Sequence, residues 1–245
     1  MNKFLMVALL LFSTIVRSDN IVDITYFISD KSSAPIQIPS ENSGIVTDVL
    51  KKLEMPNVNL VHKTLPFKRM LLTLDKSKTP WITYGSTMWD DARKHNLSAT
   101  PFMTVQHVLM TGSETHYNSI VDMLDKGRGL VLIRGFHYPG LIDYIKKMPK
   151  KVFYVKTHEA AINMVLRGRV DAFVEMKSRI AYHLNKLEIE KETIALHNFS
   201  AIIPNYDVNL SFSTDFPVAQ RNLIENQLYN LKESGQLTSI LLKYQ

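Results

Sequence analysis

Three runs of β-branched and aromatic residues decide the fold: IVDITYFI at residues 21–28, VNLVH at 58–62 and WITYGS at 81–86. Such runs are typical of buried strands. The segments between them carry apolar residues at the spacing of a helix face. These residues are Val46, Val49, Leu50 and Leu53 after Gly44, and Phe67, Met70, Leu71 and Leu74 after Pro66. The order βαβαβ predicts a parallel sheet with helices on its faces.

The same alternation begins again in the middle of the chain. Residues 130–133, 152–155 and 170–174 have the composition of strands, and each is followed by a segment with helical spacing. The last part of the chain adds a strand at 209–213 and a long helix that opens at Pro217. The sequence therefore predicts a second α/β unit, followed by a return of the chain.

The two units define the expected domains. We expect the chain to cross between them at residues 105–112 and 199–205. Lobe 1 would then comprise residues 19–108 with 203–245, and lobe 2 residues 109–202. The predicted fold class is α/β, with two βα sandwiches joined by two hinge crossovers.

The N-terminus has the form of a secretory signal peptide. Lys3 precedes an apolar run at residues 4–12, and cleavage is expected near Ser18. The alternative is an uncleaved membrane anchor, but the run is shorter than the roughly 20 residues that cross a bilayer. Cleavage would remove Lys3 and Arg17 and lower the formal net charge from +6 to +4. We expect a mildly basic mature protein in the periplasm.

Composition excludes several kinds of site. The 245 residues include no cysteine, so thiolate metal ligands, a cysteine nucleophile and a lipidated N-terminal cysteine are excluded. The eight histidines form no zinc-binding motif, and no phosphate-binding loop or nucleophile elbow is present. We expect no cofactor, no metal and, because the net charge is small, no nucleic-acid partner.

Four short motifs follow one another in a specific order. They are GIVTDVL at 44–50, GSTMWDDAR at 85–93, LRGRVDA at 166–172 and a tail with Leu, Gly and Tyr at 231–244. In this order they resemble the bacterial extracellular solute-binding proteins of family 3, the amino-acid-binding type of periplasmic receptor. The resemblance spans the chain after the signal peptide. It implies two lobes, a small ligand in the cleft between them, and closure by hinge bending.

The resemblance also implies ligand contacts on lobe 1. Arg93 would pair with a ligand carboxylate, since a guanidinium offers two parallel charge-assisted hydrogen bonds. The alternative is a surface arginine beside Asp90 and Asp91. Ser86 and Thr87 would present hydroxyl and backbone donors after the third strand, or serve as plain loop residues.

Three more residues of this lobe are candidates for the cleft or the core. Trp89 is expected to form a cleft wall. Arg69 is either a second cleft cation or a solvated residue on the polar side of its helix. Phe67 is predicted to lie in the core, because it falls on the apolar stripe of that helix.

On lobe 2, Phe136 follows Gly135 in a turn whose free N–H groups are suited to an anion, or which is a tight turn without a ligand. Phe136 stands where the family has a small hydroxyl residue, which disfavours a standard amino acid as ligand. Glu175 lies near the position at which the family has an acidic residue that pairs with the ligand ammonium. The alternative is that Glu175 is a solvated carboxylate at the end of a strand. Asp171 is expected to cap locally or to pair with Arg169.

The leading functional prediction is a monomeric, non-enzymatic periplasmic protein that binds a small polar, carboxylate-bearing, amino-acid-like solute. Its partner would be an ABC permease or a membrane sensor. The alternative is an enzyme on the same scaffold, such as a dehydratase of cyclic carboxylic acids, with Arg93 holding the carboxylate and Glu175 as general acid. A sensory or peptidoglycan-associated module is the third. The fold cannot decide among these, because the site carries the function.

Overall fold

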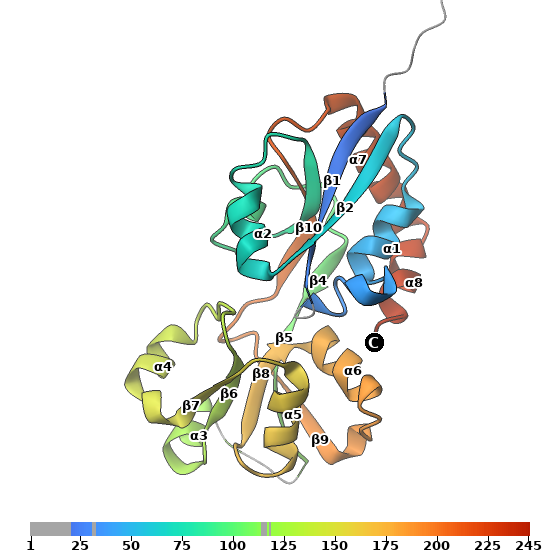
Figure 1. The fold of residues 1–245 in the computed structure, drawn as a ribbon. Helices are drawn as coiled ribbons and strands as arrows, with labels where there is room; N and C mark the ends of the chain where they lie inside the picture. The colour runs from blue at the N-terminus through green and yellow to red at the C-terminus, as the bar shows by residue number, and fades with distance from the viewer. Residues whose placement is uncertain (1–20, 31–32, 114–116, 118) are drawn as a thin grey trace, which may run out of the picture.

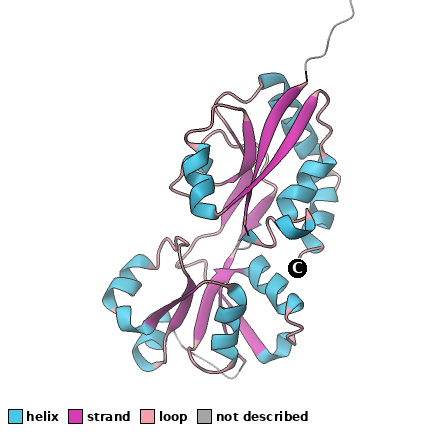
Figure 2. Cartoon of the chain, viewed as in Figure 1, coloured by secondary structure: helices cyan, strands magenta, loops and turns pink. Residues whose placement is uncertain are grey.

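The chain folds into two lobes, each built on its own five-stranded sheet (Figures 1 and 2). The computed structural model describes residues 21–30, 33–113, 117 and 119–245. The predicted signal peptide lies outside these residues. Among the helices in the described ranges, none has the length and apolar character needed to cross a membrane. The predicted α/β fold class, with two lobes, is confirmed.

The first lobe contains a mixed sheet with the strand order β2-β1-β3-β10-β4. Its strands are β1 (Val22–Ser29), β2 (Val58–Leu65), β3 (Trp81–Gly85), β4 (Met103–Val105) and β10 (Tyr206–Phe212). Strand β1 pairs in parallel with β2 and β3, as the βαβαβ pattern predicts. Strand β10 runs antiparallel between β3 and β4. A strand from the end of the chain therefore lies inside the sheet that the beginning of the chain builds.

Helices cover both faces of this sheet (Figure 1). They are α1 (Ile45–Lys52), α2 (Phe67–Leu74), α7 (Val218–Glu233) and α8 (Gln236–Leu242). The C-terminal part of the chain is fastened to α1 at Tyr244, which donates a hydrogen bond to Asp48 at 2.7 Å and accepts one from the N–H of Gly44 at 2.8 Å. These bonds hold the C-terminus against the start of α1.

The second lobe contains the sheet β7-β6-β8-β5-β9. Its strands are β5 (His107–Gly112), β6 (Leu130–Ile133), β7 (Val152–Val155), β8 (Ala172–Met176) and β9 (Ile194–Asn198). Its helices are α3 (Ile120–Lys126), α4 (Ile142–Lys147), α5 (His158–Leu166) and α6 (Lys177–Lys186). Strand β6 is parallel to β7 and β8, whereas β5 is antiparallel to β8 and β9. This sheet repeats the mixed topology of the first.

Two details of the second lobe differ from the sequence predictions. Helix α4 begins at Ile142 and not at Pro139, because the preceding turn is closed by the buried Tyr138, whose hydroxyl accepts the N–H of Ile133 at 2.9 Å. Asp171 pairs with Arg128 and not with Arg169. Its carboxylate also accepts the backbone N–H of Arg128, so it fixes the turn that leads into β6.

The chain crosses between the sheets twice. One crossing leads from Val105 of β4 to His107 of β5, and the other from Asn198 of β9 to Tyr206 of β10. The parallel strands of both sheets end toward the space between the lobes (Figure 1). Ligands of open α/β sheets bind beyond the carboxyl ends of such strands. The topology therefore brings the residues at the carboxyl ends of the strands of both sheets to the space between the lobes.

Candidate ligand-binding cleft

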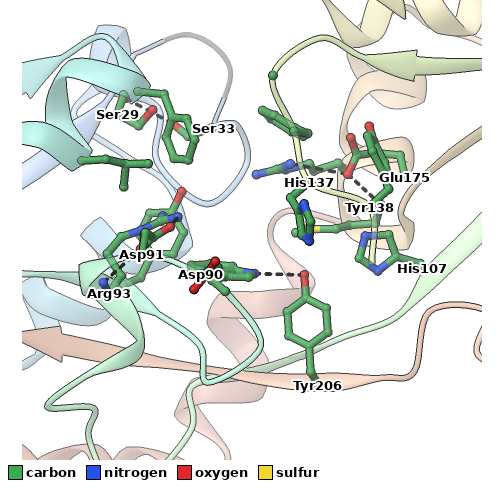
Figure 3. Close-up of a pocket in the computed structure, with 18 residues that line it drawn as sticks. Ser29, Ser33, Asp90, Asp91, Arg93, His107, His137, Tyr138, Glu175 and Tyr206 are labelled. Carbon is green, nitrogen blue, oxygen red and sulfur yellow. Dashed lines mark hydrogen bonds and ion pairs between the residues drawn. The ribbon is translucent and has the colours of Figure 1, made fainter. Parts of the chain in front are cut away.

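A cavity of about 350 Å³ lies between the two lobes, and its size is within the range of small-molecule sites. Lobe 1 forms one wall and lobe 2 the opposite wall, with Tyr206 beside their junction (Figure 3). The side chains of lobe 1 that line it are Ser29, Ser33, Phe67, Leu71, Tyr84, Trp89, Asp90, Asp91, Arg93 and Tyr206. Those of lobe 2 are His107, Phe136, His137, Tyr138, Glu175, Met176 and Arg179.

Arg93 is buried in the wall of lobe 1, with 4% of its surface exposed. It follows β3 in a short 3₁₀ helix, Ala92–Lys94, which Asp91 caps by accepting the N–H of Arg93. The Asp91 carboxylate also accepts two side-chain hydrogen bonds, from Nε of Arg93 at 2.9 Å and from Nη2 at 2.8 Å. Burial would raise the pKa of Asp91, but the hydrogen bonds and charge of Arg93 outweigh burial and lower it. The two side chains form a bidentate ion pair within the wall.

Aromatic rings surround the Arg93 guanidinium. Its central carbon lies 4.3 Å from the ring centroid of Trp89, 5.0 Å from that of Phe67 and 5.5 Å from that of Tyr84. A cation above an aromatic face is attracted by the ring quadrupole. Trp89 also donates from Nε1 to the hydroxyl of Tyr206 at 3.4 Å. The wall of lobe 1 is therefore largely aromatic around Arg93, and Asp91 neutralises the charge of this arginine.

Glu175 is the corresponding acid of lobe 2, with 1% of its surface exposed at the end of β8. It accepts the N–H of Met176 at 2.8 Å, lies 3.0 Å from Nε2 of His158, and pairs with Nη1 of Arg179 at 3.4 Å. Burial would raise the pKa of Glu175, but the charge of Arg179 and the contact with His158 lower it to about 2. Glu175 is therefore an ionised, fully buried carboxylate and not a solvated strand end.

Arg179, in the first turn of α6, completes this second pair. Its guanidinium lies 4.8 Å from the ring centroid of Phe136. Two polar atoms of this wall are buried without a hydrogen-bond partner among the described residues: Nε of Arg179 and Nδ1 of His107. Burial lowers the pKa of His107, which favours its neutral form. Each lobe thus presents an arginine paired with its own acid and covered by aromatic rings.

Two stacked histidines lie behind Glu175. The rings of His158 and His183 are 4.5 Å apart and nearly parallel, at 9°. Nδ1 of His183 lies 3.2 Å from Oε1 of Glu159. Burial and the neighbouring His158 nevertheless lower the pKa of His183 to about 4. The imidazole of His183 is therefore predominantly uncharged at neutral pH.

The structure brings four of the seven predicted site residues to the cavity: Arg93, Trp89, Phe136 and Glu175. Ser86, Thr87 and Arg69 are not among the residues that line it. The buried Ser86 hydroxyl donates to the carbonyl of Asp207 at 2.7 Å and fastens the turn to β10. Thr87 is exposed in the loop after β3, and Arg69 is exposed on α2.

Phe67 differs from its prediction, since it lines the cavity and is only half-buried. The apolar stripe of α2 is wider than its contact with the sheet, and its first turn reaches the cleft. In the turn after Gly135, the Phe136 N–H is bonded to the carbonyl of Ile133 at 3.3 Å and is not free for an anion, which agrees with the alternative of a tight turn.

Sequence reasoning missed the partners of the two central residues. Asp91 enters the prediction only as a neighbour of a surface arginine, and Arg179 has no predicted role, although each has a local signal. Asp91 stands two residues before Arg93, at a cap position, and Arg179 stands four residues after Glu175, close enough along the chain to pair across the junction of β8 and α6. His107 and Tyr206 carried no such signal, because they enter the site from the two crossings.

Two chemical properties of the site bear on function. In the described ranges, no group of three or more His, Cys, Asp or Glu side chains has the arrangement to hold a metal ion. Glu175 is ionised at neutral pH and surrounded by donors, so it has no proton to give as a general acid. The arrangement is suited to holding a molecule between two walls.

No family model matches the chain, and no curated protein matches it in sequence. Solved structures match its fold. A histidine kinase sensor domain with similarity to periplasmic binding proteins is 15% identical, with a TM-score of 0.66, over 93% of this chain and 97% of that domain. The GluR0 ligand-binding core in complex with L-glutamate is 13% identical, with a TM-score of 0.68, over 93% and 99%.

The arginine-, lysine- and histidine-binding protein ArtJ from the thermophilic bacterium Geobacillus stearothermophilus is 15% identical, with a TM-score of 0.65, over 91% of this chain and 94% of that protein. At these identities the likeness concerns the fold. The chain has the two-lobed fold of the periplasmic binding proteins.

Proposed function

We propose that this protein captures a small solute between its two lobes, as a solute-binding protein outside the cytoplasmic membrane. The observation that carries the proposal is the cavity of about 350 Å³, which both lobes line and which the two chain crossings flank. Two lobes joined in this way can close over a ligand by bending at the crossings. Structural neighbours described as binding arginine, lysine and histidine, or L-glutamate, support the same role.

The proposed molecule is a periplasmic monomer whose hinges lie at the two crossings. The proposed lobe 1 comprises residues 19–108 with 203–245 and lobe 2 residues 109–202, so the first boundary falls two residues inside β5 (His107–Gly112) of the second sheet. A permease or a membrane sensor would receive the loaded form. The structural neighbours include both a sensor domain and a binding protein, so they favour neither partner over the other. The proposed ligand contacts are the cavity-lining residues Arg93, Trp89 and Glu175, with Phe136 from the opposite turn.

The resemblance suggests an amino-acid-like solute, whose carboxylate Arg93 would receive. Asp91 engages Nε and Nη2 of this guanidinium, so the ligand carboxylate would bind through Nη1 and the second N–H of Nη2. The dehydratase alternative receives no support from the site, because its proposed acid, Glu175, is held ionised by Arg179 and His158.

A ligand screen followed by scattering tests the proposal. A solute at about 100 times its dissociation constant should add roughly 2.7 kcal/mol to the free energy of unfolding, which a thermal-shift screen of a metabolite library detects. The solute found should then reduce the radius of gyration in small-angle scattering, because the lobes close. A library without any stabilising solute, or an unchanged radius at saturation, would contradict solute capture.

A further inference from the structure

Each arginine that lines the cavity has donors that its own acid does not use. A guanidinium carries five N–H groups, and a bidentate carboxylate takes two of them. Asp91 accepts from Nε and Nη2 of Arg93, at 2.9 and 2.8 Å. Glu175 accepts from Nη1 of Arg179 at 3.4 Å. Nη1 of Arg93 and Nη2 of Arg179 donate no hydrogen bond to any of the described residues.

These two nitrogens are accessible from the cavity. Among the described residues, the buried side-chain atoms without a partner include Nε of Arg179, but neither Nη1 of Arg93 nor Nη2 of Arg179. Both of these nitrogens therefore keep accessible surface. Since Arg93 is only 4% exposed, Arg179 is only 5% exposed and both line the cavity, that surface faces the cavity and not bulk solvent.

The two arginines approach the cavity from opposite walls. Arg93 belongs to lobe 1, and Arg179 belongs to the first turn of α6 in lobe 2, paired with Glu175 of the opposite wall (Figure 3). The rings of Phe67 and Phe136 lie 6.3 Å apart, and each ring packs against one of the guanidinium groups. The cavity therefore offers a free cationic edge on each wall, with aromatic surface between them.

The charges around the cavity favour an anion. The two buried ion pairs cancel, and Asp90, the remaining carboxylate of the lining, is exposed and pairs with Lys94 at 3.0 Å. Lys68 of α2 brings a further positive charge to the rim, because its Cε lies 3.8 Å from the position that a Cβ of the lining residue Gly135 would occupy. Lys68 is exposed and forms no ion pair within the described ranges. The balance of these charges is positive, which attracts a negatively charged solute.

We propose that the solute carries two anionic groups joined by a short apolar spacer, one bound by Nη1 and Nη2 of Arg93 and the other by Nη2 of Arg179. This inference rests on the proposed function, since it names the ligand class of the same cavity. It assigns Arg179 to a second anion subsite in lobe 2, with Glu175 as the residue that positions its guanidinium. A ligand that bridges the walls in this way favours the closed form, because each end is held by a different lobe.

Acidic amino acids and simple dicarboxylates share this chemistry, and matched probes distinguish them. L-glutamate and L-glutamine have nearly the same shape and differ in the second negative charge, as do glutarate and its monoamide. Succinate, adipate and pimelate, each with its monoamide, vary the spacer. Calorimetry on the native protein should show at least one diacid binding about tenfold or more tightly than its own monoamide, because only a second carboxylate forms a charge-assisted hydrogen bond with Arg179.

Variants of Arg179 test the second subsite. Arg179→Gln should reduce the preference for the diacid over its monoamide to within about twofold, and should change the affinity for the monoamide much less. The double variant Glu175→Gln with Arg179→Met removes the buried pair as a whole, and gives the same test if Arg179→Gln does not fold. Arg134→Gln removes a positive charge from an exposed residue of the same lobe outside the cavity lining, and should retain the native preference.

The outcomes separate this inference from the proposed function. A diacid preferred over its monoamide, with that preference lost in the Arg179 variants but not in Arg134→Gln, supports both. Within that result, tighter binding of L-glutamate than of glutarate assigns the ligand to the acidic amino acids, and the reverse assigns it to the simple dicarboxylates. If no diacid is preferred over its monoamide, or if the preference survives in either Arg179 variant, the inference is overturned. If the metabolite screen then finds a solute with at most one anionic group that closes the lobes, solute capture stands and only the ligand class is wrong. If no solute closes them, both are wrong.

Discussion

The rings of Phe67 and Phe136 meet across the cleft, with centroids 6.3 Å apart and planes at 55°. Phe67 opens α2 in lobe 1, and Phe136 lies in the turn after β6 in lobe 2. Each ring is covered on its own side by an arginine, Arg93 at 5.0 Å and Arg179 at 4.8 Å. The contact therefore joins the two lobes through groups that also line the cavity.

Phe136→Ala should shift the ligand-free protein toward an open form. Aromatic pairs contribute about 0.5–1.5 kcal/mol beyond the area they bury, so loss of the contact should favour opening roughly fivefold. Small-angle scattering should show a larger mean radius of gyration. Phe153→Ala, which truncates an exposed phenylalanine of β7, should leave the radius unchanged. A native radius in Phe136→Ala would mean that this contact does not hold the lobes together.

Arg93→Ala should lower the free energy of unfolding by about 2 to 4 kcal/mol, because it leaves the half-buried Asp91 without its cation. Denaturant unfolding measures the loss. The double variant Asp91→Ala with Arg93→Met should recover most of it, since no unpaired charge remains. Lys94→Ala breaks the exposed pair with Asp90 and should cost less than about 1 kcal/mol. A loss in Arg93→Ala no larger than that control would show that the buried pair contributes little to stability.

Acid should destabilise the protein between about pH 6.5 and pH 4. Burial and His158 lower the pKa of His183 to about 4 in the fold, against about 6.5 for an unfolded imidazole. Stability from this lowered pKa is present above pH 6.5 and is lost as the pH falls, because the unfolded chain binds the proton first. At about 1.36 kcal/mol per unit, a lowering from 6.5 to about 4 sets an upper limit of about 3.4 kcal/mol on the full loss.

Urea unfolding at a series of pH values measures this dependence. His183→Gln should reduce the slope between pH 6.5 and pH 4 without abolishing it, because burial also lowers the pKa of His107. His62→Gln, at an exposed position of β2, is the control and should retain the native slope. An undiminished slope in His183→Gln would assign the acid sensitivity to other groups.

The exported protein should begin near residue 19. The positive Lys3, the apolar run at 4–12 and the small Ser18 motivate this expectation. Mass spectrometry of protein from the periplasmic fraction determines the first residue. Recovery of the chain with residues 1–18 intact, or in the membrane fraction, would contradict processing.

The sequence by itself determined the order of strands and helices. The period-two and period-3.6 patterns from residue 21 to residue 86 specify βαβαβ, and short-range backbone preferences suffice to make them. The same patterns place Glu175 at the end of a buried strand, at the sheet edge where ligands bind, whereas Arg93 is a candidate through the family resemblance. Both residues line one cavity, in opposite walls.

Only the tertiary structure decided that these two residues are buried and paired within the walls of a cavity. Asp91 turns back onto Arg93, and Arg179 onto Glu175, because burial makes an unpaired charge costly and a nearby opposite charge neutralises it. Periodicity also placed Phe67 in the core, whereas the docking of lobe 2 leaves its ring against Phe136. A pattern along the chain specifies which face of an element is apolar. What that face meets depends on contacts between residues far apart in sequence, and these form only when the lobes pack together.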